Sequence, residues 1–177
     1  PKTGSAPLAL EPSQAVRDSI RIDLNDDGHK ELVLTVGETE SDSLPPAHFS
    51  ILYVFDVPDS GAIGKPLFVD AVENGSKLYA RDITGNGSPD LVVQLDAGGN
   101  NPVSSRGLHI YGFRADDVFT LLFYNASGNP EIKDLDGNGS EEILVSAMYW
   151  GAGAHAEGVI YTQSIHQFDG EMFAQAN

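Results

Sequence analysis

The chain has 177 residues, 41% of them apolar, and a formal net charge of −16 against only ten basic residues. This length suits one domain with its own hydrophobic core, and the complete lack of cysteine excludes disulfides, thiolate metal sites and a cysteine nucleophile. So acidic a surface repels nucleic acid and anionic bilayers, which leaves cation binding, attraction to a basic partner, or simple solubility as explanations of the charge.

Residues 1–17, with the proline-rich start "PKTGSAPLALEP", are expected to form a leader or linker. A single β domain is predicted over 18–177, in three repeats of about 18–78, 79–131 and 132–177. No stretch keeps a 3.6-residue apolar period, whereas β-branched and aromatic runs alternate with Gly, Asn, Asp and Pro throughout. The sequence therefore predicts an all-β protein.

One loop pattern occurs three times along the chain. Counted from an aspartate at position 1, it has an oxygen-bearing residue at 3, Asp or Asn at 5, Gly at 6, Asp or Glu at 9, and then aliphatic residues. The copies are "DLNDDGHKE" (23–31, the first loop), "DITGNGSPD" (82–90, the second loop) and "DLDGNGSEE" (134–142, the third loop). An Asx–Gly pair alone is an ordinary hairpin turn, but three copies in one short chain favour a metal site.

The spacing of these oxygens is typical of a calcium loop. Calcium takes six to eight oxygen ligands, and alternate residues of a tight loop can point their side chains to one centre, with position 7 offering its backbone carbonyl. The predicted ligands are Asp23, Asn25, Asp27, His29 and Glu31; Asp82, Thr84, Asn86, Ser88 and Asp90; and Asp134, Asp136, Asn138, Ser140 and Glu142. The second loop has only two carboxylates, so weaker binding or no binding is expected there, and two stronger sites elsewhere.

At these loops the sequence resembles the FG-GAP (VCBS) repeat family, the calcium-loop blades of integrin-alpha-type β-propellers. The resemblance covers nearly the whole chain as three units. It implies four-stranded blades, with each loop lying between the outer strand of one blade and the inner strand of the next.

Twelve strand segments are expected. They are "DSIRIDL", "ELVLTV", "FSILYVFDV", "PLFVDAV", "KLYARDI", "LVVQL", "LHIYGF", "VFTLLFY", "PEIKDL", "EILVSAMYW", "GVIYTQSIHQF" and "EMFAQ". With units that begin after each loop, the third lacks one strand, and the N-terminal strand is expected to complete it and so remove two exposed edges. The predicted fold is a compact propeller-like or distorted barrel-like array of three four-stranded repeats. The alternative is a fragment of a larger ring.

Three long connections are expected at the end of the sheets opposite to the calcium loops: 37–48, 97–107 and 149–158. Long loops on a rigid scaffold are common recognition sites. The third connection carries Tyr149, the only tryptophan, Trp150, and His155, and aromatic anchors of this kind are typical of contact hot spots. The alternative is that Tyr149 and Trp150 cap the core from the strand end.

Three function classes follow from these features. The preferred one is a calcium-stabilised binding module, periplasmic or secreted because calcium is abundant there, that recognises a basic protein; an inhibitor or immunity protein against a lysozyme-like cell-wall enzyme would suit such an acidic surface. The second is a carbohydrate-binding or adhesive repeat of a larger surface protein. A hydrolase is the third, but the sequence has no recognisable nucleophile or catalytic motif, so no enzymatic activity is expected. His48, His109 and His166 show no metal-ligand spacing and are expected to be structural.

Overall fold

The computed structural model of the chain describes residues 10–39, 49–57, 63–73, 76–96, 106–114, 118–125, 128–150 and 159–176. Twelve strands form within these ranges. They are β1 (Gln14–Ile22), β2 (Glu31–Glu38), β3 (Phe49–Phe55), β4 (Phe68–Glu73), β5 (Lys77–Arg81), β6 (Asp90–Asp96), β7 (Arg106–Phe113), β8 (Phe119–Asn125), β9 (Asn129–Lys133), β10 (Glu142–Trp150), β11 (Val159–Phe168) and β12 (Phe173–Gln175). The predicted all-β class and twelve strands are confirmed, and β1 begins inside the expected leader. None of the described residues is helical, so this part of the chain holds no membrane-spanning helix.

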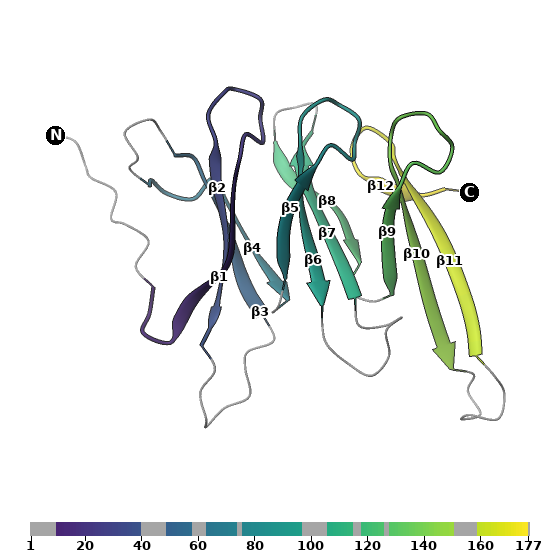
Figure 1. The fold of residues 1–177 in the computed structure, drawn as a ribbon, viewed down its shortest axis with the longest axis horizontal. Helices are drawn as coiled ribbons and strands as arrows, with labels where there is room; N and C mark the ends of the chain where they lie inside the picture. Colours follow the sequence, from purple (N-terminus) through teal and green to yellow (C-terminus); the bar gives the residue numbers. More distant parts are fainter. Residues whose placement is uncertain are drawn as a thin grey trace.

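The strands form three antiparallel sheets, each built from four consecutive strands. The first sheet has the order β1-β2-β3-β4, the second β5-β6-β7-β8, and the third β9-β10-β11-β12. The sheets stand side by side, with the second sheet between the other two (Figure 1). Within the described ranges every strand pairs inside its own sheet, so strand pairing does not close the three sheets into a barrel.

The prediction that the N-terminal strand completes the third repeat is wrong. β1 pairs with β2 in the first sheet, from Ile22 opposite Glu31 to Gln14 opposite Glu38, and the third sheet has four strands of its own. The three loops are hairpin connections, which join β1 to β2, β5 to β6 and β9 to β10. The strand before each loop pairs with the strand after it, because a short connection costs the least chain entropy to close. Each loop therefore lies within one sheet, whereas the resemblance implied a position between two repeats.

Two apolar clusters hold the sheets together, and both use the second sheet. Val33, Leu52 and Val54 of the first sheet pack against Leu91 and Val93 of the second. The opposite face of the second sheet packs on the third in a cluster that includes Ile83, Val92, Leu108, Ile110, Leu122, Phe123, Ile143, Val145 and Phe173. Successive residues of β6 are thus buried on opposite faces, which explains why its sequence is a continuous apolar run rather than an alternating one.

The three loops lie at the same end of the three sheets (Figure 1). The pairing of Leu32 with Phe55 puts the beginning of β2 and the end of β3 at this loop end. The other end of the molecule, called here the far end, is therefore where β2, β6 and β10 finish. Both ends are positioned by the same packed sheets, so side chains there are held by rigid elements.

Candidate metal centre

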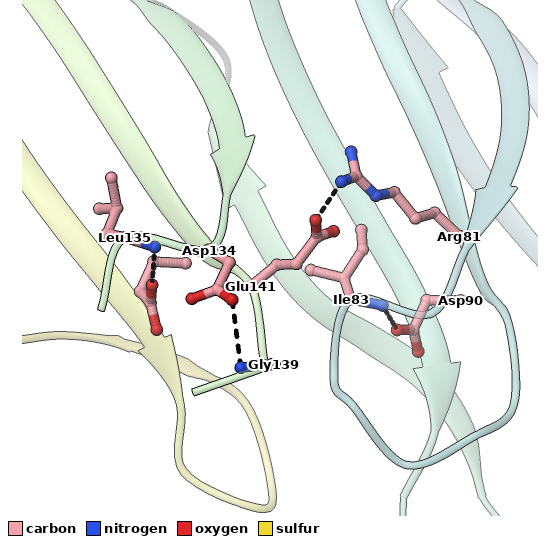
Figure 2. A network of polar contacts seen from close by, with 8 residues as sticks. Arg81, Ile83, Asp90, Asp134, Leu135, Gly139 and Glu141 are labelled. Atoms are coloured by element: carbon pink, nitrogen blue, oxygen red, sulfur yellow. Dashed lines mark hydrogen bonds and ion pairs between the residues drawn. The ribbon is translucent and has the colours of Figure 1, made fainter. Parts of the chain in front are cut away.

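The third loop is folded around the carboxylate of Asp134. Its Oδ1 accepts a hydrogen bond from the amide of Gly137 at 2.7 Å, and its Oδ2 accepts one from the amide of Gly139 at 3.1 Å. At the end of the loop, Glu142 Oε2 accepts a hydrogen bond from the Leu135 amide at 2.8 Å. Positions 1 and 9 of the loop thus lie close together, and Figure 2 shows the bond between Asp134 and Gly139.

Three carboxylates converge in this loop. One oxygen from each of Asp134, Asp136 and Glu142 lies within 4.8 Å of the others, and Glu142 is almost completely buried. Asp136 is further held by Asn138, whose side-chain amide donates to Asp136 Oδ2 at 3.0 Å. A cluster of hard oxygens with a partly exposed mouth suits a hard cation better than a soft metal.

The first loop repeats this arrangement, with Asn25 at position 3 and a carboxylate, Asp27, at position 5. Asp23 accepts hydrogen bonds from the amides of Asp27 and Gly28, and Glu31 Oε2 accepts one from the Leu24 amide at 2.8 Å. Glu31 is buried, and this burial raises the pKa of its carboxyl, against the lowering effect of the Leu24 hydrogen bond. A nearby cation would offset the cost of burying this charge.

The second loop has the same backbone but a different centre. Asp82 accepts hydrogen bonds from the amides of Gly85, Asn86 and Gly87 at 2.8–3.1 Å. Position 3 is Thr84, whose hydroxyl donates to Asp90.

Asp90 closes the second loop and already has several protein donors. The amides of Ile83 and Thr84 both donate to its Oδ2, at 2.8 and 2.9 Å. Its side chain passes over Gly112 of β7 so closely that a Cβ at that glycine would lie 2.3 Å from Oδ1. Burial raises the pKa of the Asp90 carboxyl, and the two amide bonds lower it. Asp90 therefore accepts hydrogen bonds from two backbone amides, whereas Glu31 and Glu142 each accept one such bond.

Position 4 is a functional feature that the sequence pattern missed. Asp26, Gly85 and Gly137 occupy it in the three loops, and all have a positive φ of 57° to 78°. Asp and Gly are among the residues that tolerate this left-handed conformation. The signal was present in the sequence as the restriction of this position to Asp or Gly.

The second and third loops are tied to each other. Arg81, just before the second loop, forms an ion pair with Glu141 of the third (Figure 2). The Glu141 amide also donates to the carbonyl of Ile83 at 3.3 Å. Sequence reasoning missed Glu141, because position 8 of the loop carries no repeated residue type. The second and third loops are therefore in direct contact.

A cavity of about 610 Å³ adjoins the first and second loops. Its walls include Asn25 and Asp27 of the first loop, Asn86 and Asp90 of the second, and Phe168 of the third sheet. The first and second loops thus share one hollow at the loop end.

The residues predicted to bind a partner are placed only in part. Tyr149 and Trp150 are the last residues of β10, where their backbones pair with Ile160 and Val159, and His155 lies outside the described residues. Thus the hot-spot hypothesis stays a prediction. The connections that carry it begin and end at the far end, as expected.

Of the histidines expected to be structural, two lie in described strands. His166 forms a hydrogen bond with Ser164 at 3.0 Å and packs its ring on Phe123. His109 of β7 is buried and bonds to Tyr111 through Nδ1 at 2.8 Å. His48 lies outside the described residues.

A scan against models of known protein families finds no match for this chain, and a search of curated proteins finds no relative. The resemblance to the FG-GAP repeats therefore remains a prediction from the loop pattern.

Proposed function

We propose that the protein is a calcium-stabilised binding module that recognises a basic protein. The observation that carries the metal part is the convergence of Asp134, Asp136 and Glu142 in the third loop. Within the proposal, the first loop binds a second ion through Asp23, Asn25, Asp27 and Glu31, and the second loop binds weakly or not at all. FG-GAP-type calcium blades and a propeller-like arrangement are part of the same proposal.

The role proposed for calcium is structural. The ion would neutralise carboxylates that the fold brings together and buries, such as Glu142 at 2% exposure. Without a cation, carboxylates at this spacing repel one another and each loses solvation. Calcium bound only by the native state stabilises it in proportion to the logarithm of its concentration.

The recognition part of the proposal rests on the negative net charge of the protein and on the long connections that begin and end at its far end. A net charge of −16 steers a basic protein toward this surface and raises its association rate. Calcium loops with this number of ligands are expected to be fully occupied where calcium is abundant, in the periplasm or outside the cell. A basic lysozyme-like cell-wall enzyme is the partner proposed, with the present protein as its inhibitor or immunity protein.

Thermal unfolding with calcium and with a chelator tests the metal part. The melting temperature should rise with calcium concentration and fall to a constant value in EGTA, and magnesium should have little effect because it prefers a stricter octahedral site. A melting temperature that is the same in calcium and in EGTA would overturn the calcium proposal.

Muramidase inhibition tests the partner. The protein should slow cell-wall hydrolysis by a basic lysozyme-like enzyme at micromolar concentration, and the effect should weaken as salt is added. An acidic protein of similar size and charge serves as a control for non-specific attraction. Equal inhibition by that control would refute the specific partner.

A further inference from the structure

A recess of about 210 Å³ opens between the first and second sheets. Its walls include Phe49, Asp70 and Glu73 of the first sheet, and His109 and Tyr124 of the second. Phe49 begins β3, Glu73 ends β4, and the two residues pair with each other. The recess therefore lies toward the far end, away from the metal loops. No sequence pattern pointed to it, because its residues come from four different strands.

Two hydrogen bonds determine which ring nitrogen of His109 carries the proton. The Tyr111 hydroxyl donates to Asp70 Oδ2 at 3.0 Å, since a carboxylate only accepts, and so the hydroxyl accepts from His109 Nδ1 at 2.8 Å. Nδ1 then carries the proton, and Nε2 offers a lone pair. Burial lowers the pKa of His109, which keeps the ring neutral, and burial beside Asp70 raises the pKa of Tyr111, which keeps its hydroxyl protonated.

Two acceptor atoms at the recess have no hydrogen-bond partner within the described part of the chain. They are His109 Nε2 and Glu73 Oε2, both buried. His109 is only 5% exposed, and a buried polar atom with no partner costs free energy that a bound donor would recover. Both atoms can accept a hydrogen bond from a bound donor, and one of them belongs to a carboxyl group.

Two aromatic rings flank these acceptors. Phe49 is 61% exposed and Tyr124 is 55% exposed, so both present ring surface to solvent at the recess. The Tyr124 ring meets the His109 ring edge to face, with centroids 4.6 Å apart. Exposed aromatic faces beside a carboxylate attract a cation through their quadrupoles.

We propose that this recess binds one basic side chain of a protein partner, arginine in preference to lysine. Two carboxylates, a neutral imidazole acceptor and two aromatic rings suit a guanidinium, which donates five N–H groups from a flat, stackable surface. The volume is below the range of about 300–1,000 Å³ typical of small-molecule sites, so it suits a single side chain. The inference rests on the proposed recognition of a basic protein, and places that recognition on strand residues instead of connecting loops.

The first experiment uses a minimal ligand, N-acetyl-arginine methylamide, with the full chain. Titration followed by NMR should shift the His109 ring signals with a millimolar dissociation constant, and the lysine analogue should bind several-fold more weakly. The citrulline analogue has nearly the same shape without the charge and should shift nothing. Equal binding of citrulline, or binding that leaves His109 unaffected, would overturn the proposal.

The second experiment compares two variants that remove the same charge. Glu73→Gln should weaken arginine binding about tenfold or more, because one charged hydrogen bond is lost. Glu131→Gln, at an exposed position on β9 of the third sheet, should change it less than twofold. Equal weakening by both variants would show that only net charge matters, and would refute the site.

Stability gives a separate test that does not depend on binding. Glu73→Gln should raise the melting temperature, because it removes a buried carboxylate oxygen with no partner. A purely structural role for Glu73 predicts a lower melting temperature instead. If that variant did not fold, Tyr124→Leu would test the aromatic contribution: it should weaken arginine binding at least threefold, and unchanged binding would contradict the proposal.

Measurements with and without calcium distinguish a failure of the recess from a failure of the proposed metal role. Arginine binding is measured both in calcium and in EGTA. A protein that binds arginine but melts identically in both conditions refutes the calcium proposal alone. A protein that is stabilised by calcium but does not bind arginine refutes the recess alone. Muramidase inhibition that survives Glu73→Gln unchanged would also place the partner elsewhere and overturn the recess.

Discussion

The second and third loops have the same turn but different side chains at its centre. In both, the position-1 aspartate accepts hydrogen bonds from the amides of positions 4 and 6, and the glycine at position 6 has a φ of +92°. Asp136 of the third loop becomes Thr84 in the second. At the closing position, Glu142 joins a three-carboxylate cluster, whereas Asp90 is satisfied by protein donors.

This difference shows that the repeated pattern combines two separate properties, the shape of the turn and the set of candidate metal ligands. The turn depends on the aspartate at position 1 and the left-handed residues at positions 4 and 6, and every loop has them. The proposed metal site needs in addition a carboxylate at position 3 or 5 and a long acidic side chain at position 9, which only the first and third loops have. A loop can therefore keep the turn without the carboxylates of the proposed metal site.

Glu142→Gln is expected to have the largest effect on the stability that depends on calcium. The glutamine oxygen can still accept from the Leu135 amide, so the turn should survive, but the third carboxylate is lost. With calcium at about one hundred times its dissociation constant, bound ion contributes about 2.7 kcal/mol, and the variant should lose that contribution of the third loop. Urea unfolding in calcium and in EGTA measures it, and calorimetry should count one site fewer.

Asp90→Asn is the matched variant in the second loop. It should leave the calcium-dependent part of the stability unchanged, because that loop contributes little of it. If Glu142→Gln and Asp90→Asn reduced the calcium effect equally, the distinction between the two loops would be wrong.

Asp82→Ala should lower stability by about 2 kcal/mol in calcium and in EGTA alike. Three backbone amides lose their acceptor, and each loss is partly compensated by water at this exposed turn. Chemical denaturation checks the value, with Asp56→Ala, an exposed acid at the end of β3, as control. A loss seen only in calcium would mean that Asp82 is primarily a metal ligand.

Thr84→Asp should create calcium dependence in the second loop. The new carboxylate lies beside buried Asp90, so the variant should be less stable in EGTA and should recover on the order of 1.4 kcal/mol when calcium is added. Thr84→Asn supplies an oxygen without the charge and should show much less recovery. The idea fails if the aspartate and asparagine variants respond to calcium equally.

Gly87→Ala and Gly139→Ala should lower the free energy of unfolding the least, by about 1 kcal/mol each. An added Cβ meets nothing within 4 Å at either position, so the cost is that of the left-handed backbone alone. Because the turn is shared, the two losses in EGTA should agree within about 0.5 kcal/mol. Thermal unfolding of both variants is the measurement, and a clear inequality would show that the two turns are not equivalent.

The strands and repeats were predictable because they depend on local patterns. β-branched runs and Asx–Gly turns fix which residues are extended and where the chain reverses, and all twelve expected strands are present. The pairing of the N-terminal strand was predicted wrongly, because the loop was treated as a link between repeats. A short loop favours pairing of the strands on either side of it, which places β1 beside β2.

The candidate metal site was predictable for the same reason, since its ligands lie within nine residues of one another. What the pattern could not reveal is which oxygens are already engaged. The sequence shows that the second loop has only two carboxylates, Asp82 and Asp90. The amide bonds to Asp90 and the ion pair between Arg81 and Glu141 depend on the folded backbone.

By itself, the sequence determined the all-β class, the strand segments and the three loops, because each of these results from interactions between residues close together in the chain. Only the tertiary structure decided that the loops share one end and that Asp70, Glu73 and His109 border one recess. Those residues meet because two sheets bury their apolar faces against each other. Packing of this kind depends on contacts between distant residues, which no local pattern records.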